Sequence, residues 1–191
     1  MPVRRFAFLL ALTACGGPTA EPPAPPPSPR SGYTAADVHF VSGMIHHHGQ
    51  ALVMAAWATD AVHGASPELR RMSERIFVAQ SDEIALLERW LRERNEPRME
   101  HHELMPGMLT AAQLTELDRA RGAEFDRLFL TSMIQHHLGA VTMVDQLLGA
   151  PGAAQDGLVF RMAADIHADQ TTEIERMQRM LAALPSGGKS P

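Results

Sequence analysis

Two histidine pairs, each preceded by a methionine, are the residues of this chain best suited to chemistry. The first motif reads Met-Ile-His-His-His over residues 44–48, and the second reads Met-Ile-Gln-His-His over residues 133–137. Imidazole nitrogen and thioether sulfur together suit copper, and Cu(I) in particular, whereas zinc and iron are not excluded by this donor set. The candidate metal ligands are the histidines and methionines that recur in both copies: Met44, His47, His48, Met54, Met133, His136, His137 and Met143.

The same histidines could instead only organise a protein core. Each copy is followed by a Gln and a Glu three residues apart, at Gln80 and Glu83 and again at Gln170 and Glu173. These side chains could accept a hydrogen bond from the ring nitrogen that does not bind the metal, and so fix the tautomers of metal-bound imidazoles. They could also saturate the imidazoles with no metal present, or bind a metal ion harder than copper. The sequence leaves these alternatives open.

A second candidate metal site lies between the two copies of the motif. Its possible ligands fall within ten residues: Met99, His101, His102, Met105 and Met108. Such a segment could capture copper or close over a central site. Alternatively, it is a solvated loop whose Met105 and Met108 pack as a lid on one end of the fold. The dipeptide Pro106-Gly107 marks a turn within it.

Internal repetition indicates the elements that position these residues. Residues 37–54 and 126–143 align at a constant offset of 89, with eight of eighteen positions identical. At about 100° per residue, the recurring Phe, Met, His and Ala positions share one face of a helix. The histidine pairs are therefore expected on a buried face, where an unpaired polar ring is costly.

Periodicity and capping signals predict an all-α protein. Helices are expected over residues 34–62, 67–94, 110–122, 123–148 and 155–184, with Ser, Thr, Pro and Gly at their ends. The second and last helices also match each other, at an offset of 90. The expectation is a ferritin-like four-helix bundle over residues 34–184, built from two repeated helical hairpins with a long crossover that contains a short helix.

The start of the chain has the features of an export signal. A short basic and apolar segment ends in Leu-Thr-Ala before Cys15, which resembles a bacterial lipoprotein cleavage site. Residues 1–14 are therefore predicted to be a lipoprotein signal peptide, and Cys15 is predicted to carry the lipid. The Pro-rich residues 15–33 would form a tether, and residues 185–191 a disordered tail. The protein is accordingly expected in the cell envelope, anchored to a membrane on the periplasmic side or at the cell surface.

Composition excludes some functions. The formal net charge is −5 and there is one lysine, which argues against a nucleic-acid partner. A single cysteine rules out an intramolecular disulfide framework. Twelve methionines and ten histidines are many for this length. They favour a metal ion as partner, and the sequence leaves the identity of any protein partner unknown.

The repeat resembles domain-of-unknown-function family number 305. The resemblance covers about residues 34–184 and implies a ferritin-like bundle in an exported bacterial protein. It also implies copper binding, because some members are periplasmic copper-binding proteins linked to copper tolerance. Many members have Pro where this chain has His46. The residues that carry the resemblance are Phe40, Met44, Ile45, His47, His48, Ala51, Met54, Gln80, Glu83, Ile84, Trp90, Leu91, Met105, Pro106, Gly107, Met108, Phe125, Asp126, Phe129, Met133, Ile134, His136, His137, Gly139, Ala140, Met143, Gln170, Glu173, Ile174 and Met177.

The sequence thus predicts an exported, lipid-anchored copper-binding protein that sequesters or delivers the ion and is not an enzyme. One alternative is a ferritin-like metalloenzyme such as an oxidase. Di-iron enzymes of that fold carry Glu-x-x-His motifs, and neither Glu83 nor Glu173 is followed by such a histidine. The other alternative is a metal-free structural or interaction module.

Overall fold

The computed structural model describes residues 32–99 and 104–185, and in these ranges the chain is helical with no strand. The five helices are α1 (Ala35–Thr59), α2 (Pro67–Glu93), α3 (Ala111–Arg119), α4 (Gly122–Gly149) and α5 (Gly157–Ala183). The signal peptide, Cys15, most of the tether, His101, His102 and residues 186–191 lie outside the described ranges. No helix within those ranges is long and apolar enough to cross a bilayer.

The helix starts follow the capping signals of the sequence. Thr34 and Asp37 form a reciprocal capping box, in which the Thr34 backbone N–H donates to the Asp37 carboxylate at 2.7 Å. Ser66 accepts a bond from the third residue of α2, and Pro67 occupies its first position. Thr110 begins α3 with a second capping box. Each start is therefore encoded locally.

The end of α1 comes earlier than the periodicity predicts. The helix ends at Thr59, and Asp60 adopts an extended conformation. The Asp60 carboxylate accepts a hydrogen bond from the Val62 backbone at 2.9 Å, which gives the chain an alternative to the next helical turn. Gly64 then takes a positive φ of 63°, a conformation that suits glycine in the connection to α2.

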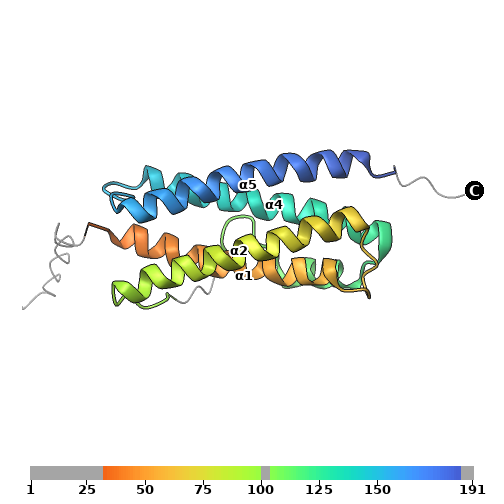
Figure 1. The fold of residues 1–191 in the computed structure, drawn as a ribbon, viewed down its shortest axis with the longest axis horizontal. Helices are drawn as coiled ribbons and strands as arrows, with labels where there is room; N and C mark the ends of the chain where they lie inside the picture. Colours follow the sequence, from red (N-terminus) through yellow and green to blue (C-terminus); the bar gives the residue numbers. More distant parts are fainter. Residues whose placement is uncertain (1–31, 100–103, 186–191) are drawn as a thin grey trace, which may run out of the picture.

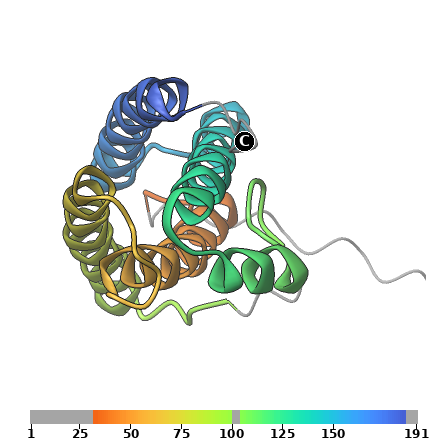
Figure 2. The ribbon, with the colours of Figure 1, turned by 90° about the vertical axis from the view of Figure 1, so that its right-hand side faces the viewer.

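The long helices form two hairpins that face each other, as the repeat predicts. Helices α1 and α2 pack together, α4 and α5 pack together, and α1 packs against α4. Figure 2 shows these four helices arranged in a ring, with α3 outside it beside α4 and α1. In Figure 1, α1 and α4 run in opposite directions. The predicted ferritin-like bundle with its crossover is confirmed.

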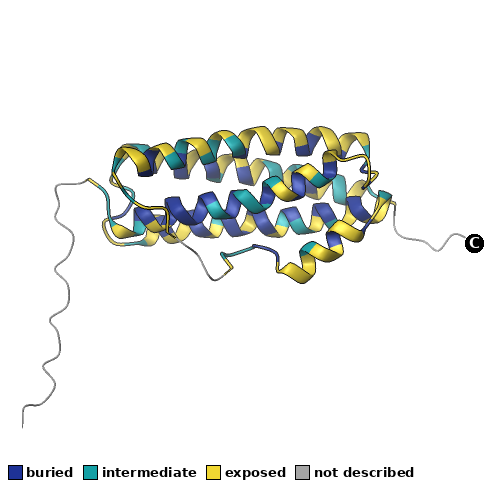
Figure 3. Cartoon of the chain, turned by 90° about the horizontal axis from the view of Figure 1, so that it is seen from below, coloured by how far each residue is buried: buried dark blue, intermediate teal, exposed yellow. Residues whose placement is uncertain are grey.

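The core consists of two apolar clusters separated by a buried polar layer. One cluster holds Met44 and Met143, and the other holds Met54 and Met133. Figure 3 shows that buried positions run along the inner faces of the helices. Between the clusters lie six polar side chains, each at most 1% exposed, which we call the polar layer: His47, His48, Gln80, His136, His137 and Gln170.

Candidate metal centre

The four repeated histidines lie together at the middle of the bundle, and we call them the imidazole cluster. Each has an exposed fraction of 0%. The pair on α1 faces the pair on α4, and the rings of His47 and His136 are closest, with centroids 3.8 Å apart. The ring centroids of His48 and His137 lie about 6 Å from those of His47 and His136, respectively. The helical spacing seen in the sequence thus brings both copies of the motif to one place.

Hydrogen bonds fix which nitrogen of three of these rings carries the proton. The Nε2–H of His47 donates to the backbone carbonyl of Pro106 at 3.0 Å, since a carbonyl can only accept. His48 and His137 place Nε2 at 2.6 and 2.7 Å from the carboxylates of Glu83 and Glu173. In a neutral ring these Nε2 atoms donate, so the Nδ1 atom of each ring carries the free lone pair.

Those lone pairs have no partner. Among the described residues, the Nδ1 atoms of all four rings and the Nε2 atom of His136 are buried without a hydrogen bond. A buried polar atom left unsatisfied costs free energy, and each such atom in a native structure calls for an explanation. A bound ion that accepts these lone pairs would supply one.

Burial also keeps the central rings neutral. It lowers the pKa of His47 from 6.5 to about 3, and the neighbouring His48 lowers it further. Burial lowers the pKa of His136 well below 6.5 too, with His47 as the next contributor. Both rings are therefore unprotonated at neutral pH, which is the state in which imidazole binds metals.

The four repeated methionines are placed on both sides of the imidazole cluster. Met44, Met54 and Met133 have exposed fractions of 0%, and Met143 has one of 5%. Met44 precedes His48 by one helical turn, and Met133 precedes His137 by the same spacing. These thioethers belong to the two apolar clusters on either side of the polar layer.

The positions of the side chains limit how an ion could be held. Within the described ranges, no group of three or more His, Cys, Asp or Glu side chains is arranged to hold a metal ion. Coordination by three imidazoles therefore requires ring rotation from the positions seen.

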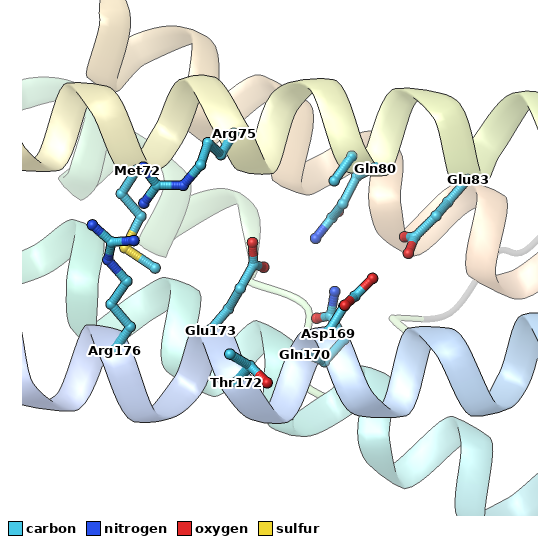
Figure 4. A pocket seen from close by; sticks show the side chains of 10 residues that line it. Met72, Arg75, Gln80, Glu83, Asp169, Gln170, Thr172, Glu173 and Arg176 are labelled. Carbon is cyan, nitrogen blue, oxygen red and sulfur yellow. The ribbon is translucent and has the colours of Figure 1, made fainter.

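The repeated Gln and Glu residues connect the cluster to a surface cleft. Glu83 and Glu173 reach the imidazoles from α2 and α5, and Gln80 and Gln170 lie in the polar layer beside them. All four line a cleft of about 320 Å³ between these two helices (Figure 4). The cleft also contains Asp169, which sequence reasoning missed because Ala79 stands at the corresponding position of the first hairpin.

The crossover turn, Pro106-Gly107, lies against the middle of the bundle and not at its end. The Pro106 carbonyl accepts a hydrogen bond from His47. Gly139 of α4 lies so close to the turn that a Cβ added to Gly139 would meet the Gly107 Cα at 2.6 Å. Sequence reasoning identified the turn but not this contact. Of the predicted loop ligands, Met99 is exposed, Met105 is partly buried and Met108 is buried.

Comparison with known proteins gives a family and several related structures. A sequence model for a domain of unknown function, DUF305, matches residues 37–181. The crystal structure of a DUF305 fragment from Deinococcus radiodurans is 30% identical and superposes with a TM-score of 0.72, covering 84% of this chain and 100% of that one. No curated protein matches the chain.

Two further structures extend the comparison. A DUF305 protein from Streptomyces coelicolor, described as secreted, is 26% identical with a TM-score of 0.71, over 81% of this chain and 98% of that one. CopM in its Cu(I)-bound form is 26% identical with a TM-score of 0.64, over 78% of this chain and 98% of that one. CopM also matches in Cu(II)-bound and silver-bound forms.

Proposed function

The chain belongs to the DUF305 family, and on this basis we propose that it binds copper, as Cu(I), through the imidazole cluster at the centre of its bundle. The observation that carries the proposal is the set of unpartnered, buried imidazole nitrogens, of which those of His47 and His136 belong to rings that burial keeps neutral. The similar protein CopM binds copper and silver, which supports a soft or borderline ion as the ligand.

The residues present fit such an ion. Imidazole nitrogen combined with thioether sulfur is a donor set for Cu(I). His47, His48, His136 and His137 would supply nitrogen, and the repeated methionines, Met44 and Met133 foremost, would supply sulfur beside it. Glu83 and Glu173 would orient two of the rings and make them better donors through their Nε2–H bonds.

The proposed role is to sequester or deliver copper in the cell envelope. An ion held in a buried layer is shielded from solvent and from unwanted redox reactions, as a storage or delivery protein requires. A lipid on Cys15 and the Pro-rich tether would hold the bundle near a membrane. The relative described as secreted supports export.

Competition titration tests this proposal. Cu(I) is titrated under anaerobic conditions into the protein in the presence of a chromophoric chelator, for the wild type and for a variant with the four cluster histidines changed to Ala. The wild type should take copper from the chelator, and the variant should lose at least tenfold in affinity. A second variant, His48→Ala with His137→Ala, keeps the test informative if the fourfold variant does not fold.

A matched control removes two histidines outside the polar layer, His39 on α1 and His167 on α5. Wild-type affinity is expected for this control. Unchanged affinity in a folded cluster variant would contradict the proposal. If affinity is lost only when Met99, His101, His102, Met105 and Met108 are changed, the copper site is the loop.

A metal-free interaction module remains the second candidate function. The observation in its favour is the lack, in the described parts of the chain, of a ready three-ligand arrangement. Elemental analysis of the protein isolated from its own cells distinguishes the two candidates. Copper at a stoichiometric level supports the proposed function, and a metal-free protein supports the module.

A further inference from the structure

An ion can reach the imidazole cluster only through an opening in the bundle. All four rings have exposed fractions of 0%, and apolar clusters fill the bundle on both sides of the polar layer. Passage along the bundle axis would require the packed leucines and aromatic rings of these clusters to move apart. The plausible routes therefore run sideways, between neighbouring helices at the level of the polar layer.

On the side where α1 packs against α4, the polar layer is covered. There the crossover turn covers the rings, and Pro106 accepts the hydrogen bond from His47 at 3.0 Å. Gln135 of α4 donates to the Gly107 carbonyl at 3.2 Å and holds the turn in place. The contact of the turn with Gly139 leaves no room for even one added carbon atom. An ion would have to displace this turn to pass.

The opposite side, between α2 and α5, is hollow. The cleft of about 320 Å³ is lined by side chains from both helices (Figure 4). Gln80 and Gln170 point toward each other across it, and each is only 1% exposed. Both amide atoms of Gln80 and the amide oxygen of Gln170 lack a hydrogen-bond partner. Amide groups buried this deeply and left unsatisfied are available to bind a polar ligand in the space between them.

The charges of the cleft favour a cation at one end. Glu83 and Asp169 line that end, Arg75 and Arg176 line the other, and Glu173 lies between the arginines and the two glutamines. The acidic side chains interact electrostatically. Partial burial raises the pKa of Asp169, and the charges of Glu83 and then Glu173 raise it further. A group of like charges at the mouth of a cleft attracts counter-ions and speeds their association, so the acidic end is the end at which a cation would enter.

We propose that the cleft between α2 and α5 is the port through which Cu(I) reaches the imidazole cluster. Asp169, Gln80 and Gln170 hold the ion in transit through their side-chain oxygens. Glu83 and Glu173 link port and cluster, because they line the cleft and bond to His48 and His137. Cu(I) prefers softer donors to oxygen, so the port passes the ion on without trapping it. This inference rests on the proposed function.

Stopped-flow kinetics tests the port. Cu(I) is supplied as its bicinchoninate complex, and its transfer to the full-length protein is followed by the loss of the complex's absorbance. Asp169→Asn, and separately Gln80→Leu combined with Gln170→Leu, should slow uptake by about threefold or more, because the charge and the transit ligands that raise the association rate are lost. The equilibrium affinity should change by less than the rate does.

Two controls accompany these variants. Asp145→Asn removes the same charge from the exposed face of α4 and should leave the rate unchanged. Gln135→Ala loosens the crossover turn and should also leave it unchanged. Asp169 is exposed, so its substitution does not depend on repacking of the core.

The outcomes separate the two proposals. If the wild type takes up no copper, the proposed function fails and the port fails with it. If copper binds the cluster but the Asp169 and glutamine variants keep the wild-type rate, the port alone is overturned. Faster uptake by Gln135→Ala would overturn it as well, since the ion would then pass under the crossover turn.

Discussion

At the scale of residues, the imidazole cluster combines two properties that rarely persist together in a folded core. All four rings are buried, burial keeps His47 and His136 neutral, and the Nδ1 atoms of the rings have no hydrogen-bond partner. A purely structural cluster would be expected to use these atoms in hydrogen bonds or to replace the rings with apolar side chains. Glu83 and Glu173 form hydrogen bonds with only the Nε2 atoms of His48 and His137, so the Nδ1 atoms of these two rings stay available for an ion.

We predict that the metal-free protein loses stability in mild acid. The pKa of His47 is 6.5 in a solvated ring and about 3 in the folded protein, so the unfolded chain binds a proton that the folded protein does not. This contribution to stability is complete above pH 6.5 and is lost as the pH falls toward 3. Lowering the pH from about 7.5 to about 5 should cost about 2 kcal/mol for His47 alone, with a further loss from His136.

Urea unfolding of the metal-free protein across this pH range measures the effect. The variant with His47→Leu and His136→Leu should show a much flatter dependence on pH. Equal pH slopes for the wild type and this variant would show that the two rings are protonated as readily in the folded protein as in the unfolded chain.

Changing the glutamate partners should weaken copper binding without removing the ligands. Glu83→Gln and Glu173→Gln keep an acceptor for the imidazole Nε2–H but remove its charge, which makes the ring a poorer donor. Each variant should lose about tenfold in Cu(I) affinity. The control is Glu175→Gln on α5, whose side chain is 63% exposed. Affinities equal to that of the control would mean that the two carboxylates do not act on the site.

At the scale of elements, the sequence predicts most of the architecture because the signals are local or repeated. Capping residues such as Thr34 and Ser66 determine where helices begin, and the duplicated pattern places His47 opposite His136. The end of α1 was not predicted, because the turn made by Asp60 competes with a periodicity that continues beyond it.

The parts of the site that escaped prediction belong to one hairpin only. The position of Gly139 in the first copy is occupied by Gln50, which exchanges two hydrogen bonds with Leu109 of the crossover. The crossover occurs once, so it contacts the two repeats differently, and the repeat pattern contains no trace of that difference. Asp169 likewise has no acidic counterpart in the first hairpin, where Ala79 stands at the corresponding position. Tertiary contacts of this kind leave no periodic signal.

The contact between the crossover turn and α4 should be sensitive to one methyl group. In Gly139→Ala the new carbon would lie within 2.6 Å of the Gly107 Cα, so the turn must withdraw from His47. We expect a loss of about 1–3 kcal/mol in the free energy of unfolding, measured by urea denaturation. Gly49→Ala in α1 is the control, because an added Cβ there meets nothing within 4 Å.

The control should be neutral or slightly stabilising, by about 0.5–1 kcal/mol, since alanine loses less backbone entropy in a helix than glycine does. If both substitutions have the same effect, the turn does not pack on α4 as tightly as the structure places it.

At the scale of the whole molecule, the features combine into a bundle with one closed side and one open side. The crossover turn covers the polar layer where α1 meets α4, and the cleft between α2 and α5, acidic at one end, leads to it. The chain carries a formal net charge of −5, which favours association with a cation. A duplicated hairpin thus gives a symmetric set of donors with an asymmetric surface around it.

The proposed membrane anchor makes a prediction at this scale. In bacterial cells, the wild type should be found in the membrane fraction and should incorporate labelled fatty acid. Cys15→Ser should incorporate none and should move to the soluble fraction, because Cys15 is the one cysteine of the sequence and the proposed point of attachment. Membrane association that survives in Cys15→Ser would contradict lipidation at this residue.

The central claim is that the imidazole cluster binds copper, and anomalous diffraction from crystals of the Cu(I)-loaded protein tests it most directly. We predict an anomalous peak at the copper edge within the polar layer, about 2 Å from at least two imidazole nitrogens. Peaks found only beside Met99, Met105 or Met108, with the four buried rings in their metal-free positions, would contradict the claim.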